Sequence, residues 1–273
     1  MAAVPLQGGT AVFLFYIVNL IFTLRHFLKA GFYNGHRVHS PNIFNFFKYV
    51  IFSKEKFDYS LAENAYAQFR KNRDNIIVTT FGAKGGKTKD VKISALARKS
   101  SSKGKYGRLL QRTANFLQPR KILELGTSLG VGTLYLSAGS PDSKIITVEG
   151  CTTIHNLARK SFAASNAANI EAINSGFDEV LDKLVSENQD IDLVYIDGNH
   201  TYKSTIYYYE LFSSRLESGA VLLFDDINWS KGMSKAWREI VKNEKSTVTI
   251  ETARMGIVFL NPKLTPKHYC TRF

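Results

Sequence analysis

Short apolar runs alternate with longer amphipathic segments along the second half of the chain. The runs cover residues 121–125, 144–149, 169–173, 192–197, 220–226, 246–251 and 256–261. Between the later runs, apolar residues recur every three to four positions, which predicts helices near residues 153–167, 177–187, 203–215 and 230–243. Strands that alternate with helices of this length are typical of βαβ units. We therefore predict an α/β fold with a seven-stranded, mostly parallel sheet, helices on both faces and a closing hairpin.

The pattern before residue 121 predicts a different organisation. Helices are indicated at residues 42–53, 59–72 and 108–117, and a strand at residues 75–81. The glycine-rich residues 82–88 are one residue short of the phosphate-binding loop motif, so we interpret Lys84, Lys87 and Lys89 as a basic flap. Small and basic residues at 100–107 indicate a boundary. We predict a basic, mainly helical extension over residues 1–100 and the sheet domain over residues 101–273.

One apolar stretch, residues 11–24, raises the question of a membrane span. It is about 14 residues long, shorter than the roughly 18–20 residues that cross a bilayer, and Asn19 interrupts it. No basic residue precedes it, which argues against a signal peptide. We expect residues 10–30 to form a helix packed on the protein or on the second subunit of a homodimer. Shallow membrane contact is the alternative.

Charge is distributed unevenly along the chain. Residues 1–120 contain 20 Lys and Arg against 5 Asp and Glu, a net charge of +15, whereas residues 121–273 carry a net charge of −2. A basic lobe indicates an anionic partner such as nucleic acid, an acidic glycan or a membrane surface; solvation of an exposed extension is the alternative. The two distant cysteines, Cys151 and Cys270, predict a reduced cytoplasmic protein, with peripheral attachment at the inner face of the membrane as the alternative.

Three glycines follow the first strand of the predicted sheet, at positions 126, 130 and 132. Their spacing, Gly-x-x-x-Gly-x-Gly, differs from that of dinucleotide-binding loops, and Glu124 just before them would repel a pyrophosphate. The loop suits a ligand that has an ammonium group and no phosphate, such as S-adenosylmethionine. Glu149 ends the second strand, where a carboxylate can accept hydrogen bonds from both hydroxyls of a ribose.

Acidic residues also end the next strands. Asp197 ends the fourth strand, and Asp225 and Asp226 end the fifth. Neighbouring strands lie about 5 Å apart, so these three carboxylates can converge on one Mg²⁺ or Mn²⁺ ion. Helix capping, or binding of the methionine ammonium by one or two of them, is the alternative. His200 lies three residues beyond Asp197 and is the candidate catalytic base, with a structural role as the alternative.

Four motifs accompany these strand ends: Glu-Leu-Gly-Thr-Ser-Leu-Gly, Val-Glu-Gly, Tyr-Ile-Asp-Gly-Asn-His-Thr-Tyr and Phe-Asp-Asp-Ile-Asn-Trp-Ser. Together they resemble the motifs of class I S-adenosylmethionine-dependent methyltransferases, closest to a Bacteroidetes-type bacterial group with O-methyltransferase-like motifs. The resemblance implies a Rossmann-like fold. The cofactor-binding residues that it implies are Glu124, Gly126, Thr127, Ser128, Gly130, Glu149, Gly150, Gly176, Phe177 and Asp197.

The resemblance also bears on the strand-end acids. They look like the metal site of catechol-type O-methyltransferases, with an Asp-Asp pair in place of Asp-Asn, as in sugar and antibiotic O-methyltransferases. Asp197, Asp225 and Asp226 are the expected metal ligands, and Asp197 and His200 the expected catalytic residues.

The function predicted from these observations is methyl transfer from S-adenosylmethionine to a hydroxyl of a small molecule or a glycan. Tyr202, Trp229 and Trp237 are candidate walls of the acceptor pocket, with core packing as the alternative. A nucleic-acid methyltransferase that uses the basic lobe is less favoured, because residues 197–200 lack the Asn/Asp-Pro-Pro-Tyr/Phe motif of amino-methylating enzymes. A non-catalytic scaffold that keeps the same fold is the remaining alternative.

Overall fold

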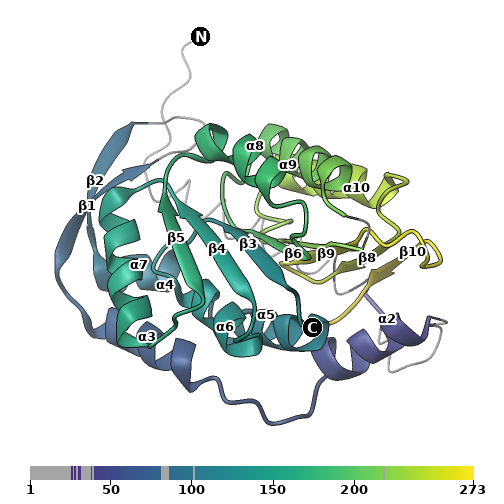
Figure 1. Ribbon diagram of the computed structural model, residues 1–273, viewed down its shortest axis with the longest axis horizontal. Coiled ribbons are helices and arrows are strands. Elements are labelled where there is room, and N and C mark those ends of the chain that lie inside the picture. Colours follow the sequence, from purple (N-terminus) through teal and green to yellow (C-terminus); the bar gives the residue numbers. More distant parts are fainter. Residues whose placement is uncertain are drawn as a thin grey trace.

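The computed structural model describes residues 26, 28, 30, 31, 38, 40–80, 86–100, 102–217 and 219–273. An eight-stranded sheet forms its centre (Figure 1). The strands are β3 (Lys121–Leu125), β4 (Lys144–Glu149), β5 (Ile170–Asn174), β6 (Leu193–Ile196), β7 (Val221–Phe224), β8 (Val248–Glu251), β9 (Gly256–Phe259) and β10 (Lys267–Cys270). Their order across the sheet is β10-β8-β9-β7-β6-β3-β4-β5.

The predicted α/β fold and its mostly parallel sheet are confirmed. Only β9 runs antiparallel to its neighbours in this sheet, β7 and β8, and β8 and β9 form the expected closing hairpin. The expected number of seven strands is wrong by one, because β10 pairs in parallel with the outer side of β8. Most of β10 is exposed or half-buried, so its sequence lacks the apolar run that marks the other strands.

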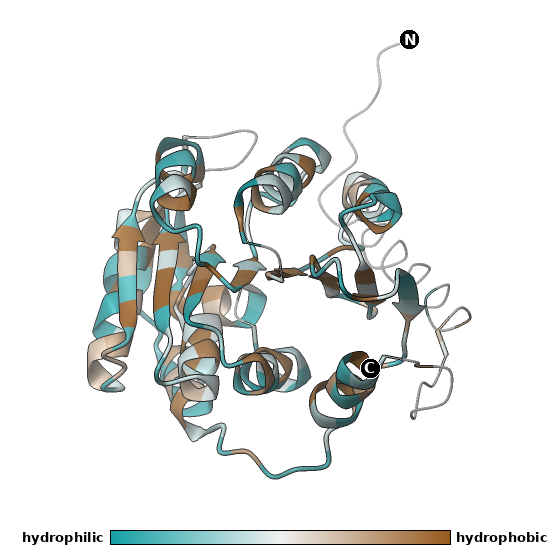
Figure 2. Ribbon diagram, turned by 45° about the vertical axis from the view of Figure 1, so that its right-hand side comes forward, coloured by the Kyte–Doolittle hydropathy of each residue, from teal (hydrophilic) through white to brown (hydrophobic). Residues whose placement is uncertain are grey.

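Helices cover both faces of the sheet, as expected (Figure 1). One face packs against α5 (Gly104–Leu117), α6 (Val131–Gly139) and α7 (Thr152–Ala164), and the other against α8 (Phe177–Glu187), α9 (Tyr202–Arg215) and α10 (Lys231–Lys242). Alternate residues of each strand enter the two cores: in β6, Leu193 and Tyr195 lie on the first face, and Val194 and Ile196 on the second. Figure 2 shows the resulting apolar stretches along the central strands.

The elements before β3 begin with α2 (Pro41–Phe46), which continues into the π-helical turn η1 (Phe47–Ile51) in place of the single predicted helix. The helix α3 (Ser60–Lys71) confirms the second prediction. Phe46 is fully buried and makes edge-on ring contacts with Phe116 and Phe259, at centroid distances of 5.6 and 5.2 Å. The first helices therefore share one hydrophobic core with the sheet. The division into an extension over residues 1–100 and a sheet domain over residues 101–273 stays a prediction.

A two-stranded hairpin and a short helix complete this part of the chain. The strand β1 (Asn75–Thr80) was expected, and it pairs antiparallel with β2 (Lys87–Lys92). Lys87 and Lys89 thus belong to a strand and not to a basic flap, and Lys84 lies outside the described residues. The helix α4 (Ile93–Ser100) was not predicted, because its short apolar pattern is bounded by lysines.

Most of the predicted helix at residues 10–30 lies outside the described residues. His26, Leu28 and Ala30 are described, and the amide of Ala30 donates to the carbonyl of His26, as in a helical turn. Gly31 forms a parallel bridge with Thr271, which places Gly31 at the edge of the sheet beside β10. Within the described part of the chain, no helix is both long enough and apolar enough to cross a membrane.

Candidate functional site

A pocket of about 720 Å³ opens at the carboxyl ends of the parallel strands. This is where open α/β sheets bind their ligands, and the volume lies within the range of small-molecule sites. The expected residues that line it are Gly126, Ser128, Glu149, Gly150, Gly176, Phe177, Asp197, His200 and Asp226. Val78, Thr79 and Lys99 also line it, so β1 and α4 of the basic extension reach the same pocket.

The glycine loop after β3 is packed tightly against the end of β6. Gly126 has a φ of +101°, and a Cβ at this position would lie 2.3 Å from the carbonyl oxygen of Asp197. Only glycine accepts both the left-handed backbone and this approach. The close packing of the loop against the end of β6 therefore requires glycine at position 126.

Glu149 lies beside this loop at the end of β4. Its Oε2 accepts from the amide of Ser128 at 2.9 Å, and its Oε1 accepts from the amide of Cys151, also at 2.9 Å. Burial raises the pKa of Glu149, while these backbone donors oppose the rise. Each oxygen keeps a further lone pair for a ligand hydroxyl. This geometry is suited to a vicinal diol.

Phe177 provides an apolar wall at the start of α8. Its ring packs on Gly198, where an added Cβ would lie 2.6 Å from a ring carbon. Trp229, whose side chain lies 46% exposed, lines the pocket as expected. Trp237 is buried in the core, so core packing replaces its expected pocket role. The hydroxyl of Tyr202 donates to Glu239 at 2.6 Å, so Tyr202 makes a surface contact in place of a pocket wall.

Three of the expected cofactor ligands do not line the pocket. Glu124 is 1% exposed, because it points to the α6 side of β3, where Thr133 and Thr147 donate hydrogen bonds to its carboxylate. Thr127 is buried against Thr147, with 2.5 Å between their hydroxyl oxygens. At Gly130, a Cβ would lie 2.4 Å from the ring of Phe162. The structure assigns these residues to the support of the loop and not to its ligand face.

Burial also changes the ionisation of Glu124. It raises the pKa of this carboxyl to about 7, although the bonds from Thr133 and Thr147 favour the charged form. A carboxylate so deep in the protein has little solvent to stabilise its charge. Its expected role as the partner of a ligand ammonium is therefore not supported by its position.

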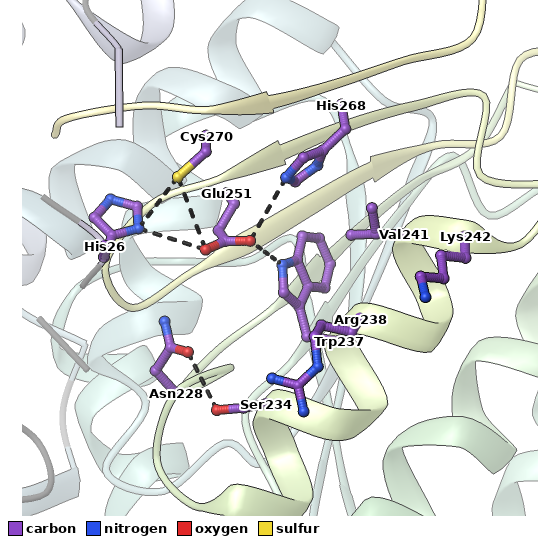
Figure 3. Close-up of a pocket in the computed structure, with 10 residues that line it drawn as sticks. All are labelled: His26, Asn228, Ser234, Trp237, Arg238, Val241, Lys242, Glu251, His268 and Cys270. Atoms are coloured by element: carbon purple, nitrogen blue, oxygen red, sulfur yellow. Dashed lines mark hydrogen bonds and ion pairs between the residues drawn. The ribbon is translucent and has the colours of Figure 1, made fainter. Parts of the chain in front are cut away.

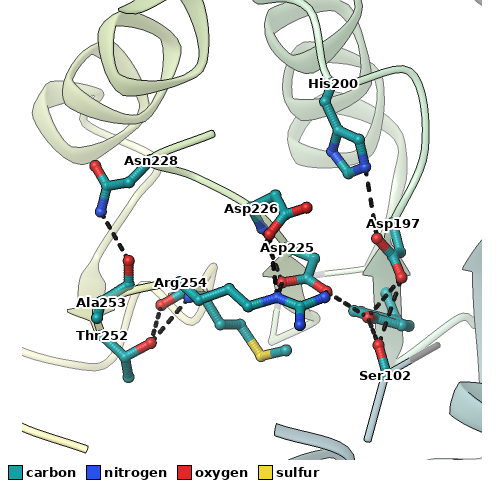
Figure 4. A network of polar contacts seen from close by, with 11 residues as sticks. Ser102, Asp197, His200, Asp225, Asp226, Asn228, Thr252, Ala253 and Arg254 are labelled. Carbon is teal, nitrogen blue, oxygen red and sulfur yellow. Dashed lines mark hydrogen bonds and ion pairs between the residues drawn. The ribbon is translucent and has the colours of Figure 1, made fainter. Parts of the chain in front are cut away.

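Acidic and basic groups converge at the other end of the pocket (Figure 4). Ligand atoms of Asp197, His200 and Asp226 lie within 4.8 Å of one another, and His200 Nε2 is 3.6 Å from Asp197 Oδ1. The second oxygen of Asp197 accepts from the hydroxyls of Tyr195 at 3.1 Å and Ser102 at 3.4 Å. The two carboxylates are thus placed to bind a divalent cation, with the imidazole of His200 beside them.

Asp225, an expected metal ligand, is used differently. Its side chain is fully buried, and Arg254 binds both of its oxygens, with distances of 2.7 Å from Nε and 2.5 Å from Nη2. The amide of Asp226 also donates to it at 2.8 Å, and the hydroxyl oxygen of Tyr195 lies 3.0 Å from its Oδ2. With both oxygens occupied by protein donors, Asp225 is not available to a cation. His200, and not Asp225, lies close to Asp197 and Asp226.

Arg254 was missed by the sequence reasoning. It lies in the turn between β8 and β9, where nothing in the local pattern distinguishes it from a surface arginine. Its Nε also lies 3.1 Å from Asp226 Oδ1, so it offsets part of the negative charge of the acidic pair. The sequence signal, an isolated arginine in a hairpin turn, is too common to be specific.

The repulsion between these carboxylates that Arg254 does not offset is seen in the pKa values of Asp197 and Asp226. Burial, followed by the charge of Asp225, raises the pKa of Asp197 well above its usual value. The same two causes raise the pKa of Asp226, against the effect of Arg254. Carboxyl groups in this condition either take up a proton or gain from a bound cation.

Comparisons with known proteins match the part of the chain that contains this site. A model of a methyltransferase domain matches residues 123–227, which contain the glycine loop and the acidic strand ends. An O-methyltransferase, hkm8, from Aspergillus hancockii is 31% identical over 130 residues, which make up 45% of this chain and 50% of the relative. The chain thus spans about half the length of this curated relative.

Solved structures share the fold at low sequence identity. The O-methyltransferase from Bacillus cereus, in complex with SAH, has a TM-score of 0.52 and 17% identity, covering 77% of this chain and 95% of its own. The O-methyltransferase TomG from Streptomyces achromogenes, involved in tomaymycin synthesis and in complex with SAM, has a TM-score of 0.52 and 16% identity, covering 81% and 95%. Residues 123–227 are therefore similar to a methyltransferase domain, and the sheet with its flanking helices has the fold of these solved O-methyltransferases.

Proposed function

We propose that the protein transfers a methyl group from S-adenosylmethionine to a hydroxyl group of a small molecule or a glycan, assisted by a divalent cation. The observation that carries the proposal is the presence of two different sites in one pocket. Glu149 at one end suits a ribose diol, and the cluster of Asp197, His200 and Asp226 at the other end suits a cation and an acceptor hydroxyl.

The residues that surround the first site fit the cofactor. The two backbone bonds orient the carboxylate of Glu149, Gly126 lets the chain approach the methionine part closely, and Phe177 offers an apolar face for adenine. The two solved O-methyltransferases that share this fold are in complex with SAH and SAM, which supports this ligand. Methyl transfer from a sulfonium is an in-line displacement, so alignment of donor and acceptor is the main task of such a pocket.

The second site fits a hard cation. Asp197 and Asp226 each offer a carboxylate oxygen, and their raised pKa values indicate a deficit of positive charge. Mg²⁺ or Mn²⁺, when bound there, would lower the pKa of an acceptor hydroxyl. His200 is placed to accept the hydroxyl proton, because its Nε2 lies beside Asp197 and its side chain is 26% exposed at the pocket.

Cofactor binding tests the first half of the proposal. Glu149→Ala should weaken the binding of S-adenosylmethionine by about 1.5–3 kcal/mol, the range for hydrogen bonds to a charged group. Glu149→Gln should lose less, because one amide oxygen remains to accept. Calorimetric titration measures both variants. Equal affinity of the Ala variant and the parent would contradict the placement of the ribose.

Metal binding and transfer test the second half. Asp226→Asn should weaken Mn²⁺ binding and methyl transfer while leaving cofactor affinity nearly unchanged. His200→Ala should slow transfer with a smaller effect on Mn²⁺ binding. Asp178→Asn is the matched control, since Asp178 lines the same pocket outside the cluster. Transfer is followed with labelled cofactor and a panel of catechol, flavonoid and glycoside hydroxyls. Full transfer in excess chelator would exclude a role for the metal.

A nucleic-acid acceptor remains a second candidate because of one observation. Lys99 lines the pocket, so the basic extension lies beside the site of transfer. A mobility shift of RNA or DNA that weakens steeply with salt would support this candidate, because phosphate contacts release counterions. The absence of any shift at low salt would leave the small-molecule or glycan acceptor.

A further inference from the structure

A second cluster of metal-ligating residue types lies away from the cofactor pocket, at the edge of the sheet (Figure 3). Glu251 ends β8 and Cys270 ends β10, and the two residues are direct partners in the parallel pairing of these strands. His26 joins them from the segment that precedes α2. His26 thus meets two residues that lie 225 and 244 positions away in the sequence.

The separations within this cluster match those around a zinc ion. His26 Nδ1 lies 3.5 Å from Glu251 Oε1 and 3.6 Å from Cys270 Sγ, and the sulfur lies 3.9 Å from the same oxygen. Tetrahedral zinc, with bonds of about 2.0–2.3 Å to nitrogen, oxygen and sulfur, places its ligand atoms roughly 3.4–3.6 Å apart. Shifts of a few tenths of an ångström would bring all three atoms to these distances.

The orientation of His26 is that of a metal ligand. The ring is 3% exposed, and Nε2 donates to the carbonyl of Thr271 at 2.9 Å. A carbonyl only accepts, so the proton of the neutral ring is held on Nε2, and the lone pair of Nδ1 faces Glu251 and Cys270. Metal-binding histidines are commonly oriented by such an outer hydrogen bond.

The other oxygen of Glu251 is fixed by a different partner. Oε2 accepts from Trp237 Nε1 at 2.8 Å and lies 3.7 Å from His268 Nε2. This leaves Oε1 directed at His26 and Cys270 (Figure 3). A pocket of about 410 Å³ adjoins the cluster and gives water a route to a fourth coordination position. Arg238 and Lys242 also line this pocket.

We propose that His26 Nδ1, Glu251 Oε1 and Cys270 Sγ bind one Zn²⁺ ion, with water as the fourth ligand. A mixed nitrogen, oxygen and sulfur set suits zinc, in contrast to the Mg²⁺ or Mn²⁺ expected at Asp197 and Asp226. The ion joins the segment around His26 to the ends of β8 and β10, next to the bridge between Gly31 and Thr271. Its role is to attach His26 to the edge of the sheet.

Cobalt substitution of the full chain tests this site without any assay of activity. Co²⁺ bound to a thiolate gives a ligand-to-metal charge-transfer band, which carboxylate and imidazole ligands do not give. The cluster of Asp197, His200 and Asp226 contains no sulfur, so cobalt at that site does not contribute to the band. We expect the band to saturate at one equivalent and to disappear when Zn²⁺ is added in excess.

Two cysteine variants make the test specific. Cys270→Ser should abolish the band, whereas Cys151→Ser should keep it, because Cys151 is buried beside Val78 and Ile154 in another part of the molecule. His26→Gln should weaken Zn²⁺ binding at least tenfold. Because this variant keeps the thiol of Cys270, it tests the site even if Cys270→Ser fails to fold. The proposal would be overturned if the folded parent showed no band, or if the band survived in Cys270→Ser. It would also be overturned if His26→Gln bound Zn²⁺ as tightly as the parent, or if only Cys151→Ser lost the band.

Discussion

The substitution Glu124→Gln should stabilise the protein at neutral pH and not at acidic pH. Glu124 is almost completely buried, and burial raises the pKa of its carboxyl from 4.5 to about 7. As the pH rises between these values, Glu124 ionises in the unfolded chain before it does so in the folded protein. The unfolded state then binds fewer protons, so the free energy of unfolding of the parent falls. Glutamine does not ionise and is free of this loss.

The magnitude follows from the size of the shift. Each pKa unit corresponds to about 1.4 kcal/mol, so the shift of Glu124 corresponds to about 3 kcal/mol. The side-chain oxygen of glutamine can accept from Thr133 and Thr147 as the carboxylate does, so little hydrogen bonding is lost. The stability of Glu124→Gln relative to the parent should therefore increase by about 3 kcal/mol between about pH 4 and pH 8.

Urea unfolding across this pH range measures the difference, with the cofactor and metals absent. Glu171→Gln is the control for the removal of one carboxylate, because Glu171 is half-exposed on the neighbouring strand β5 and pairs with Lys144. A constant difference between Glu124→Gln and the parent at all pH values would refute the reasoning. It would mean that the interior stabilises the charge of Glu124 as well as water does.

Four other substitutions test separate parts of the structure, each by urea unfolding or thermal melting. Arg254→Met leaves the carboxylate of Asp225 buried without its partner and should cost about 3–5 kcal/mol; a loss below about 1 kcal/mol would contradict the buried ion pair. Phe46→Ala should cost about 3–5 kcal/mol if α2 belongs to the main core, and a negligible loss would place it outside. Ser230→Ala removes the N-cap bond of α10 and should cost about 1 kcal/mol, whereas no loss would show that another acceptor replaces it. Gly126→Ala should destabilise the loop and abolish cofactor binding in calorimetry, and normal binding would show that the loop can move away from β6.

The strands and helices could be predicted from the sequence because burial requires apolar residues at positions that are close together in the chain. A strand with helices on both faces needs apolar residues throughout, and β6 and β7 are continuous apolar runs in which all residues are buried. The acids at the strand ends could also be predicted, from the parallel arrangement of the strands. In a parallel sheet, the residues that follow each strand meet at one edge, so the proximity of Asp197 and Asp226 follows from topology.

Side-chain direction and partners depended on the tertiary structure. Glu124 precedes the loop by two residues, but the alternation of side chains along β3 turns it into the core, whereas Glu149 at the end of β4 lines the pocket. The separation of Asp225 from Asp226 depends on Arg254, which approaches from a turn that is distant in the sequence. Two adjacent aspartates look equivalent in a sequence until such a partner distinguishes them.

The sequence by itself therefore determined the sheet, the glycine loop and the set of acids, because each depends on neighbours a few residues apart or on the order of the strands. The tertiary structure alone decided which of these side chains face a ligand. It also brought His26 to Glu251 and Cys270, although these residues share no motif. Contacts of this kind arise when the edge of a sheet pairs with a distant segment, and neither hydrophobic periodicity nor residue spacing carries that information.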